Sequence, residues 1–242
     1  MAMAETTFTI DELPIPFTSG QTILEAAKAA GIYIPHLCYH PEFQAHGGCK
    51  MCTVMVNGKP QTACTHKAAA EQEVEVDTPE LNSMRRTLVQ MMFIEGNHFC
   101  PGCEKSGACQ LQALAYEYEM LSPHFVEFYP HRDIDASHPD VMIEFNRCVL
   151  CELCVRASRD VDHKEVFAIA GRGQNAKLII NSPTGKLGDS ALAVTDRAAH
   201  VCPVGAIIVK RVGFAASPIG ERKYDRGSIS AEVETRETSE AL

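Results

Sequence analysis

The first 78 residues show short runs in which apolar and polar positions alternate, the pattern of half-buried strands. Such runs occupy 8–10 and 15–17, and the acidic pair Asp11-Glu12 between them predicts a hairpin. Thr22-Ile-Leu-Glu25 fits a capping box. The alanine-rich stretch that follows predicts a helix ending at Gly31.

The strand pattern continues to residue 76. Val54 and Val56 alternate with other residues before Asn57-Gly58, which is a strong signal for a two-residue hairpin turn. The return strand is expected to run through Thr62 to Cys64, and a last strand is expected at 74–76. Residues 1–78 are therefore predicted to form a small α+β domain.

After residue 78 the apolar residues recur at helical spacing. Thr78-Pro79-Glu80 is a typical helix start, and the helix should stop near Gly96-Asn97. We interpret its apolar stripe as ordinary core rather than a redox motif, because Met is a common filler of cores. That stripe comprises Leu81, Met84, Leu88, Met91 and Met92. A second helix is predicted to begin near Cys109 and to carry Leu111, Leu114, Tyr118 and Leu121.

Residues 122–214 form the third predicted segment, which opens with a proline-containing connector at 122–140. Strands at 167–169 and 178–180 flank Gly171-Arg-Gly173, which lacks the further glycine and the following helix of a nucleotide-binding loop. From Gly213 the chain turns polar, and its end is charged and poor in aromatic residues. The expected segments are 1–78, 79–121, 122–214 and a partner-contacting tail at 215–242.

Composition and charge narrow the function classes. The 242 residues include 22 Lys and Arg against 31 Asp and Glu, a net charge of −9. An acidic chain offers no electrostatic footprint for nucleic acid or an anionic membrane surface. No apolar stretch reaches the ~18 residues of a membrane helix, and the start of the chain lacks a secretion signal. We expect a cytoplasmic protein with neither a nucleic-acid nor a membrane partner.

The eleven cysteines fall into three groups separated by long cysteine-free gaps. An odd number does not fit a closed disulfide framework, and thiols inside a cell are kept reduced. Metal binding is therefore the expected use of these side chains. Iron–sulfur clusters require about four soft ligands that converge on one cage.

The first group is spaced as a variant of the plant-type ferredoxin pattern. Its members are Cys38, Cys49, Cys52 and Cys64. Gly47-Gly48 precede the central pair and allow backbone N–H groups to approach the sulfurs. We interpret the group as a 2Fe-2S site; a structural zinc is the alternative, although closed zinc sites usually use two short-spaced pairs. Since four thiolates suffice, the neighbouring histidines are interpreted as surface or packing residues: His36, His40, His46 and His66.

The second group, Cys100-x2-Cys103-x5-Cys109, is one ligand short of four. His98 is the nearby candidate for the fourth ligand; Asn97, a water and a histidine from elsewhere in the chain are the alternatives. A neutral imidazole in place of a thiolate makes a cluster less negative, and in Rieske centres such a replacement raises the reduction potential. This site is therefore expected to differ in potential from its neighbours.

The third group repeats at the tight spacing that is characteristic of 4Fe-4S binding. Its members are Cys148, Cys151, Cys154 and, far downstream in a Cys-Pro dipeptide, Cys202. Bacterial two-cluster ferredoxins place a further cysteine soon after the triplet, but that position is Ser158 here. The simplest count is one 4Fe-4S cluster, with zinc as the alternative. No hydrolytic triad or phosphate-binding loop is evident.

Four segments carry a resemblance to a known family: 95–110 (EGNHFCPGCEKSGACQ), Cys202-Pro-Val-Gly205, 210–213 (KRVG) and 218–224 (PIGERKY). With the order of the three cysteine groups, they resemble the N-terminal part of the large iron–sulfur subunit of complex I and the opening of many iron-only hydrogenases. The chain is most similar to diaphorase gamma subunits of soluble NAD-reducing nickel–iron hydrogenases, over nearly its whole length.

This resemblance implies an α+β fold with three parts. The first is a β-grasp 2Fe-2S ferredoxin domain. The second is a helical 4Fe-4S segment with one histidine and three cysteine ligands, and the third is a bacterial-ferredoxin-like 4Fe-4S domain. In the complex I pattern the ligand histidine stands four residues before the first cysteine of the second group. Gly96 occupies that position here, and the hydrogenase resemblance places the histidine at His98 instead.

The same resemblance implies a non-catalytic electron-transfer subunit of an oxidoreductase. One 2Fe-2S and two 4Fe-4S clusters would pass electrons between the hydrogenase small and large subunits and a flavin- and NAD-binding diaphorase subunit. FMN, NAD and the nickel–iron centre are expected on those partners. Two alternatives stay open: an electron-input subunit of a complex-I-like or formate dehydrogenase assembly, and a zinc-stabilised scaffold without a redox role.

Overall fold

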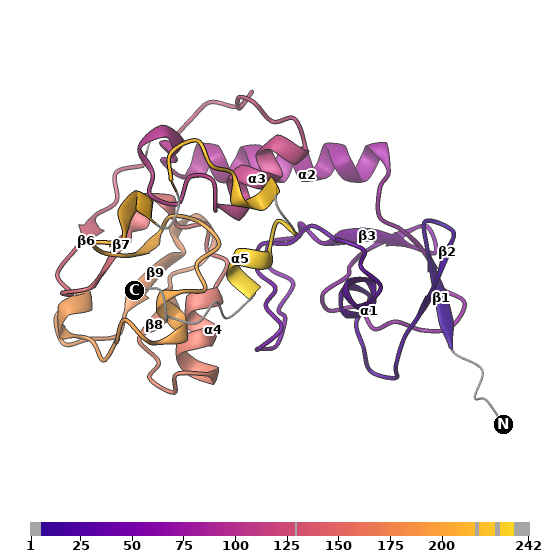
Figure 1. Cartoon of the computed structure of the whole chain (residues 1–242), viewed down its shortest axis with the longest axis horizontal. Coiled ribbons are helices and arrows are strands. Elements are labelled where there is room, and N and C mark those ends of the chain that lie inside the picture. Colours follow the sequence, from indigo (N-terminus) through magenta and orange to yellow (C-terminus); the bar gives the residue numbers. More distant parts are fainter. Residues whose placement is uncertain (1–5, 129, 216–217, 226–227, 235–242) are drawn as a thin grey trace. The chain divides into compact units, whose positions relative to one another are not determined.

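The computed structural model of the chain describes residues 6–128, 130–215, 218–225 and 228–234 (Figure 1). It divides into two compact units. The first comprises the described residues up to 39 together with 45–88, and the second comprises 40–44 and the described residues from 89 onward. The short stretch 40–44 therefore belongs to the second unit, although the first unit surrounds it in sequence.

The strands described in the first unit form a mixed five-stranded sheet in the order β2-β1-β5-β3-β4. Their bounds are β1 Thr7–Ile10, β2 Leu13–Pro16, β3 Thr53–Val56, β4 Lys59–Thr62 and β5 Glu73–Glu75. The β1–β5 pair is parallel and the other pairs are antiparallel. Both predicted hairpins are confirmed, and Asn57 and Gly58 both have positive φ, as the predicted turn requires. Strand β4 ends at Thr62, two residues short of the expected end at Cys64.

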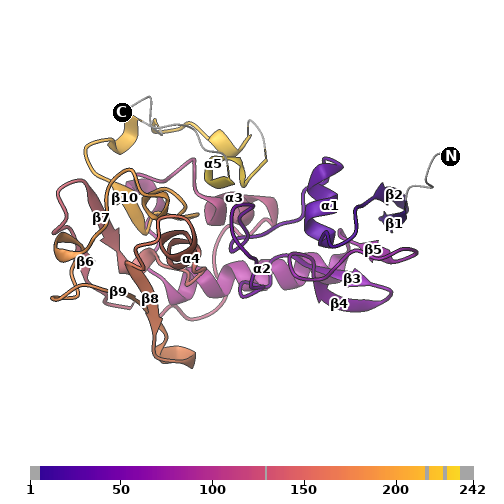
Figure 2. The same ribbon diagram turned by 90° about the horizontal axis from the view of Figure 1, so that it is seen from below.

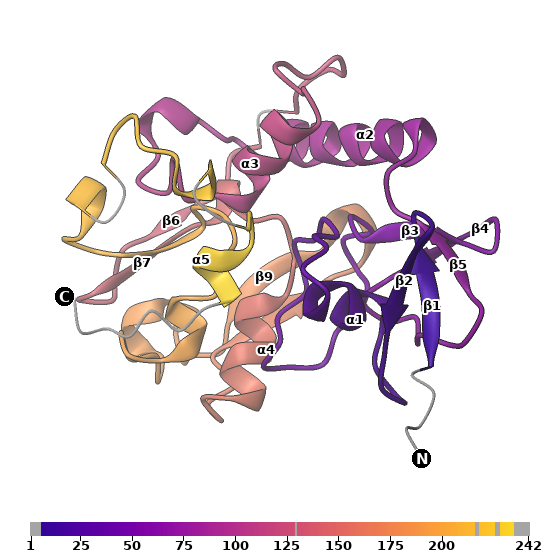
Figure 3. The same ribbon diagram turned by 45° about the vertical axis from the view of Figure 1, so that its right-hand side comes forward.

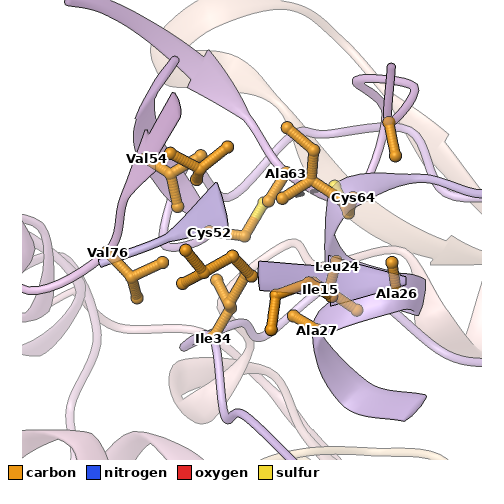
Figure 4. Close-up of a cluster of buried hydrophobic side chains, with 14 of the residues drawn as sticks. Ile15, Leu24, Ala26, Ala27, Ile34, Cys52, Val54, Ala63, Cys64 and Val76 are labelled. Atoms are coloured by element: carbon orange, nitrogen blue, oxygen red, sulfur yellow. Dashed lines mark hydrogen bonds between the residues drawn. The ribbon is translucent and has the colours of Figure 1, made fainter. Parts of the chain in front are cut away.

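Helix α1 (Ile23–Ala29) packs against this sheet (Figure 2). The predicted capping box is present: Thr22 Oγ1 accepts the Glu25 N–H at 3.2 Å, and the Glu25 carboxylate accepts the Thr22 N–H at 2.7 Å. The core between helix and sheet includes Ile15, Leu24, Ile34, Val54 and Val76, with Cys52 and Cys64 among them (Figure 4). Two of the predicted ligands thus lie within the apolar core of the unit.

Helix α2 (Pro79–Glu95) begins and ends where the sequence predicts. The prediction that its methionine stripe forms core is only partly right. Met91 is 49% exposed, whereas the line of buried residues one turn apart is Leu81, Arg85 and Val89. Arg85 can be buried because backbone carbonyls accept its guanidinium hydrogen bonds. The buried face of α2 is therefore not the face that the apolar residues alone predict.

The second unit carries two small sheets. One has the order β10-β7-β6 and the other is the β8–β9 hairpin, with bounds β6 Ile134–Asp135, β7 Val141–Glu144, β8 Phe167–Ala170, β9 Lys177–Ile180 and β10 Ile207–Val209. The predicted strand pair around Gly171-Arg-Gly173 is confirmed as β8–β9. Helix α4 (Leu153–Asp160) lies beside this hairpin (Figures 1 and 3). Single turns of 3-10 helix are η1 Cys100–Gly102, η2 Phe145–Arg147, η3 Gly173–Asn175, η4 Leu187–Asp189, η5 Arg197–Ala199, η6 Gly213–Ala215 and η7 Lys223–Asp225.

Helix α3 (Gln110–Glu117) begins at the predicted place but ends earlier than predicted. Tyr118 caps its end and Leu121, expected on its apolar face, is 83% exposed. The chain as a whole mixes helices with small sheets, as predicted. None of the helices in the described part of the chain is long and apolar enough to cross a bilayer.

The predicted tail from residue 215 folds back in part onto the second unit. Lys223 N donates to Gly107 O at 2.7 Å, and helix α5 (Ala231–Glu234) buries Val233. Residues 235–242 lie outside the described residues, so a partner-contacting tail stays a prediction.

Candidate metal centres

The four cysteines of the first group are brought together in the first unit. Cys52 lies directly before β3, and Cys64 lies two residues after β4. Their Sγ atoms are 3.2 Å apart. Cys38 Sγ accepts the Cys49 N–H at 3.5 Å. Lys50 adopts positive φ between the central cysteines, which gives the Cys49–Cys52 loop its tight curvature.

Mutual contact governs the protonation of these thiols. A side-chain hydrogen bond between the Cys38 and Cys49 thiols, together with burial, raises the pKa of Cys38, while that thiol–thiol bond lowers the pKa of Cys49. A hydrogen bond with Cys64, together with burial, raises the pKa of Cys52. Since four thiolates cannot coexist at such short range without a cation, this donor set fits a metal–sulfur group whose binding releases the protons.

Arg85 supports the first group and was not found by sequence reasoning. It is 1% exposed, and it donates to Val76 O at 2.8 Å, Thr53 O at 2.8 Å and Met51 O at 3.3 Å. Met51 precedes Cys52 and Thr53 follows it, so the guanidinium fixes the backbone on both sides of that thiol. A lone Arg in a helix gives no sequence signal for this role, because the carbonyls that it binds come from distant turns.

The neighbouring histidines make contacts within the protein chain. His36 Nδ1 lies 2.6 Å from Ile34 O, and His66 Nε2 lies 3.2 Å from Gln72 Nε2. His40 is fully buried in the second unit, where its Nδ1 accepts the Glu42 N–H. His46 lies against Gly48. These contacts suit the packing roles that the sequence suggests.

The three cysteines of the second group surround a short loop in the second unit. Cys100 opens η1, the Cys103 N–H donates to Cys100 O at 3.2 Å, and Cys109 is the residue before α3. Burial, with a contribution from Cys103, raises the pKa of Cys100. Burial first, then Cys100 and Cys103, raise the pKa of Cys109 to about 12. The three sulfurs are thus close enough to influence one another.

His98 carries an unsatisfied polar atom beside this loop. Its Nε2 is buried and has no hydrogen-bond partner among the described residues. Burial first, and then the Arg147 cation, lower the pKa of His98 to about 4. The ring is therefore neutral at physiological pH, which is the form that binds metals. A buried, unpaired ring nitrogen is the donor that a cluster with three thiolates lacks.

The presence of Gly96 in place of the histidine of the complex I pattern is matched by the packing around that residue. A Cβ built on Gly96 would lie 2.4 Å from His98 Nε2 and 2.9 Å from Asn146 O. The imidazole therefore occupies the space into which a side chain at position 96 would project. With the histidine at position 98, a glycine at position 96 is the residue that leaves this space open.

A second glycine, Gly205 of the Cys202–Gly205 motif, lies close to the second cysteine group. A Cβ on Gly205 would lie 2.6 Å from Cys103 Sγ. Arg147 Nη1 donates to Gly205 O at 3.3 Å and to Glu104 Oε2 at 3.2 Å. The Cys202–Gly205 motif of the third group thus runs against the second group, with a cation beside it. Sequence reasoning found this motif without a role for Gly205 or Arg147.

The cysteines of the third group line one pocket, which holds about 360 Å³ of space not filled by atoms, open solvent included. The rest of its lining is almost entirely aliphatic, including Ile169, Leu178 and Ile207. Leu150 and Glu152 adopt positive φ and curl the loop that carries the first three thiols. The four predicted ligands in this pocket are Cys148, Cys151, Cys154 and Cys202.

Burial dominates the chemistry of the third group. It raises the pKa of Cys148 to about 11 and those of Cys151 and Cys154 well above the usual range, with further contributions from Cys202. Arg156 on α4 holds the loop by donating to Cys151 O at 3.2 Å, and it also donates to Gln44 O at 2.9 Å. A largely aliphatic pocket walled by four thiols fits a 4Fe-4S cluster in donor type and in the apolar character of its lining.

All eleven cysteines lie in the described residues, and none forms a disulfide. Among these residues no three His, Cys, Asp or Glu side chains are grouped so as to hold a single metal ion. The donors are instead arranged in the three separate sets described above.

Comparison with known families assigns iron–sulfur chemistry to three consecutive regions. The family described as a 2Fe-2S iron-sulfur cluster binding domain matches residues 3–79. The NADH-ubiquinone oxidoreductase-G iron-sulfur binding region matches 85–124, and the 4Fe-4S single cluster domain matches 141–209. Each region contains every cysteine of one of the three groups.

A near full-length relative decides the family. The chain is 39% identical over 224 residues to the NAD-reducing hydrogenase HoxS subunit gamma of Cupriavidus necator, covering 92% of this chain and 94% of that protein. The chain belongs to the NAD-reducing hydrogenase gamma-subunit family. A solved structure agrees: the crystal structure of NAD+-reducing [NiFe]-hydrogenase in the H2-reduced state contains a chain 54% identical to this one, with a TM-score of 0.88 and coverage of 96% and 97%.

The gamma-subunit family is related to complex I. The chain is 30% identical over 220 residues to the NADH-ubiquinone oxidoreductase 78 kDa subunit of Candida albicans, but it spans only 30% of that protein. The predicted relationship to both families is confirmed, and this member is an iron–sulfur subunit of a hydrogenase-type oxidoreductase.

Proposed function

We propose that this chain passes electrons, one at a time, through one 2Fe-2S and two 4Fe-4S clusters. The electrons would move between a nickel–iron hydrogenase module, with its small and large subunits, and a diaphorase subunit that binds FMN and NAD. The single observation that carries this proposal is the gathering of eleven cysteines into three sets in a gamma-subunit fold, with the unpartnered ring nitrogen of His98 two residues before the set of three. The relay is expected to work in the cytoplasm.

Ligands are assigned set by set. The 2Fe-2S cluster would be held by Cys38, Cys49, Cys52 and Cys64. One 4Fe-4S cluster would be held by His98, Cys100, Cys103 and Cys109, and the other by Cys148, Cys151, Cys154 and Cys202. His98 is supported by its buried, unpartnered Nε2.

Each bound cluster supplies reversible one-electron redox chemistry. The residues around each cluster determine how strongly the negative charge of its reduced state is stabilised. Aliphatic walls surround the third set, and Arg147 places a positive charge beside the second. Gly205 brings the backbone of the Cys202 motif into contact with Cys103, which shortens the path between two of the sets. No side chain is required to make or break a bond.

The complex I relatives favour a second assembly, in which this chain is the electron-input subunit of a complex-I-like enzyme. Metal analysis of the purified complex separates the two. Nickel in stoichiometric amount supports the hydrogenase relay, whereas quinone-linked activity without nickel supports the alternative.

A ligand substitution tests the relay. Cys148→Ser is expected to remove one 4Fe-4S signal from electron paramagnetic resonance (EPR) spectra and to abolish hydrogen-driven NAD reduction. Hydrogen-driven and NADH-driven reduction of artificial dyes should persist, because those half-reactions belong to the partners. Val149→Ala, which alters a neighbouring non-ligand in the same pocket, is the matched control. Full NAD reduction in a complex that lacks the signal would refute the relay.

A further inference from the structure

Tyr224 buries a hydroxyl group that has no partner among the described residues. The residue is 7% exposed, and its Oη makes no hydrogen bond there. A buried hydroxyl without a partner loses its hydrogen bonds to water without replacement, and the great majority of buried polar side-chain atoms are hydrogen-bonded. Phenylalanine would avoid that loss. We therefore expect the hydroxyl to have a hydrogen-bond partner that is not part of the described protein chain.

The surroundings of Tyr224 belong to the second cysteine group. Lys223 N donates to Gly107 O at 2.7 Å, two residues from Cys109. The Tyr224 ring stacks on Tyr116 of α3, the helix that starts after Cys109, with centroids 6.5 Å apart. These contacts attach the PIGERKY segment to both sides of Cys109.

Arg222 fixes the orientation of this aromatic pair. Its guanidinium carbon lies 4.4 Å from the Tyr116 ring centroid and 5.2 Å from that of Tyr224. It also forms an ion pair with Asp225 at 2.8 Å. The phenol is therefore held from its ring face, while its hydroxyl end is left without a partner in the described part of the chain.

Electrostatics agree with this placement. Burial above all raises the pKa of Tyr224 to about 12, and Cys109 is among the groups that raise it further. The hydroxyl therefore keeps its proton at physiological pH and can act as a hydrogen-bond donor. A neutral hydroxyl would be a favourable donor to a cluster-bound thiolate, because hydrogen bonds to charged acceptors are stronger than neutral ones.

We propose that the Tyr224 hydroxyl donates a hydrogen bond to sulfur of the second cluster, at Cys109 or an adjoining sulfide, and thereby raises its reduction potential. The inference rests on the proposed second cluster. Donors to sulfur stabilise the additional negative charge of the reduced state. A neutral His98 ligand acts in the same direction, so the chain would use two devices to make this centre the easiest to reduce.

The test is a redox titration of the assembled complex monitored by EPR, comparing wild type, Tyr224→Phe and Tyr116→Phe. Tyr224→Phe is expected to lower the midpoint potential of the second cluster and to leave the other two unchanged. Tyr116→Phe removes a hydroxyl from the half-exposed partner ring and is expected to shift none. An unchanged second potential in Tyr224→Phe, or an equal shift in both variants, would overturn the inference.

Pulsed EPR in D2O provides a readout independent of potential. Wild type should show an exchangeable deuteron coupled to the second cluster that Tyr224→Phe lacks. The same coupling in both proteins would count against the hydrogen bond, as would a higher melting temperature of Tyr224→Phe with unchanged potentials. If wild type holds no second cluster, the proposed function fails together with this inference; a normal cluster with no response to Tyr224→Phe defeats the inference alone.

Discussion

Two glycines of the second unit stand where any side chain would collide with Cys103 or His98, two of the ligands proposed for the second cluster. Gly205 faces Cys103 Sγ, and Gly96 faces the His98 ring. Neither role depends on an unusual backbone conformation, since what each position requires is space. Each glycine therefore matters because it leaves room for the neighbouring Cys103 or His98 side chain.

Gly96→Ala is expected to displace the His98 imidazole, because the new methyl group would lie 2.4 Å from its Nε2 and 2.9 Å from the Asn146 carbonyl. Changes in residues that orient metal ligands typically cost about 10- to 100-fold in metal affinity. We expect the second cluster to be lost correspondingly more readily under a chelator, as followed by its EPR signal. Met91→Ala, at an exposed position of α2, is the control. Equal retention in the two variants would show that His98 does not hold the cluster.

For single residues, the sequence predicts function where the residue type itself has few possible uses. Cysteine spacing by itself defines the three sets, since few other uses explain eleven thiols in such groups. Arg85, Arg156 and Tyr224 could not be found in this way. Each acts through partners far away in sequence or through a group outside the protein chain.

Among the elements, the short strand β6 is held by one buried carboxylate. Asp135, 2% exposed, accepts from Ser137 N at 2.9 Å, Ser137 Oγ at 2.6 Å and Leu187 N at 2.8 Å. Burial alone would raise its pKa, but these hydrogen bonds outweigh burial, and the pKa of Asp135 is lowered. A carboxylate with a lowered pKa stabilises the fold above its unfolded pKa, and this stabilisation is lost as the pH falls through the folded value.

Asp135→Asn should therefore lower the free energy of unfolding by about 1–3 kcal/mol at pH 7, the cost of weakening hydrogen bonds to a buried charge. The difference from wild type should shrink as the pH falls below about 4, where the unfolded carboxyl takes up a proton, and should vanish once the pH has passed the lower folded pKa. Urea titrations followed by circular dichroism measure both quantities. A difference independent of pH would mean that the charge of Asp135 is not what holds β6 to η4.

The sequence predicts a helix or turn whose boundaries are set by neighbouring residues. It does not predict a boundary that depends on contacts elsewhere in the fold. The capping box at Thr22 and the Asn57-Gly58 turn act within a few residues, so the sequence shows them directly. The end of α3 has no such signal. Glu119 adopts the left-handed conformation usually left to glycine, and Met120 N donates to Ala115 O at 2.8 Å. This closure stops the helix before Leu121 although the apolar pattern continues.

For the whole molecule, the division into units differs from the linear order of the predicted segments. Residues 40–44 follow Cys38 yet belong to the second unit, where Arg197 donates to Glu42 Oε2 at 2.8 Å. Such an exchange has no local signature, because it depends on charges 155 positions apart in sequence. The order of the three cluster-binding regions, in contrast, was predictable because each carries its own cysteine motif.

The three proposed ligand sets would also couple folding of the chain to metal binding. Buried thiols keep their protons in the chain by itself, so cluster binding must displace protons and add the bonds that hold distant loops together. The stability of the native chain should therefore depend on the clusters being present and complete.

The most direct measurement is an iron and acid-labile sulfide count on the purified complex, combined with EPR at graded potentials. We predict about ten iron atoms for this chain, with one 2Fe-2S and two 4Fe-4S signals. Each signal should disappear when a cysteine of its own set is replaced. Zinc in place of iron, or fewer than three signals from this chain, would contradict the three-cluster relay.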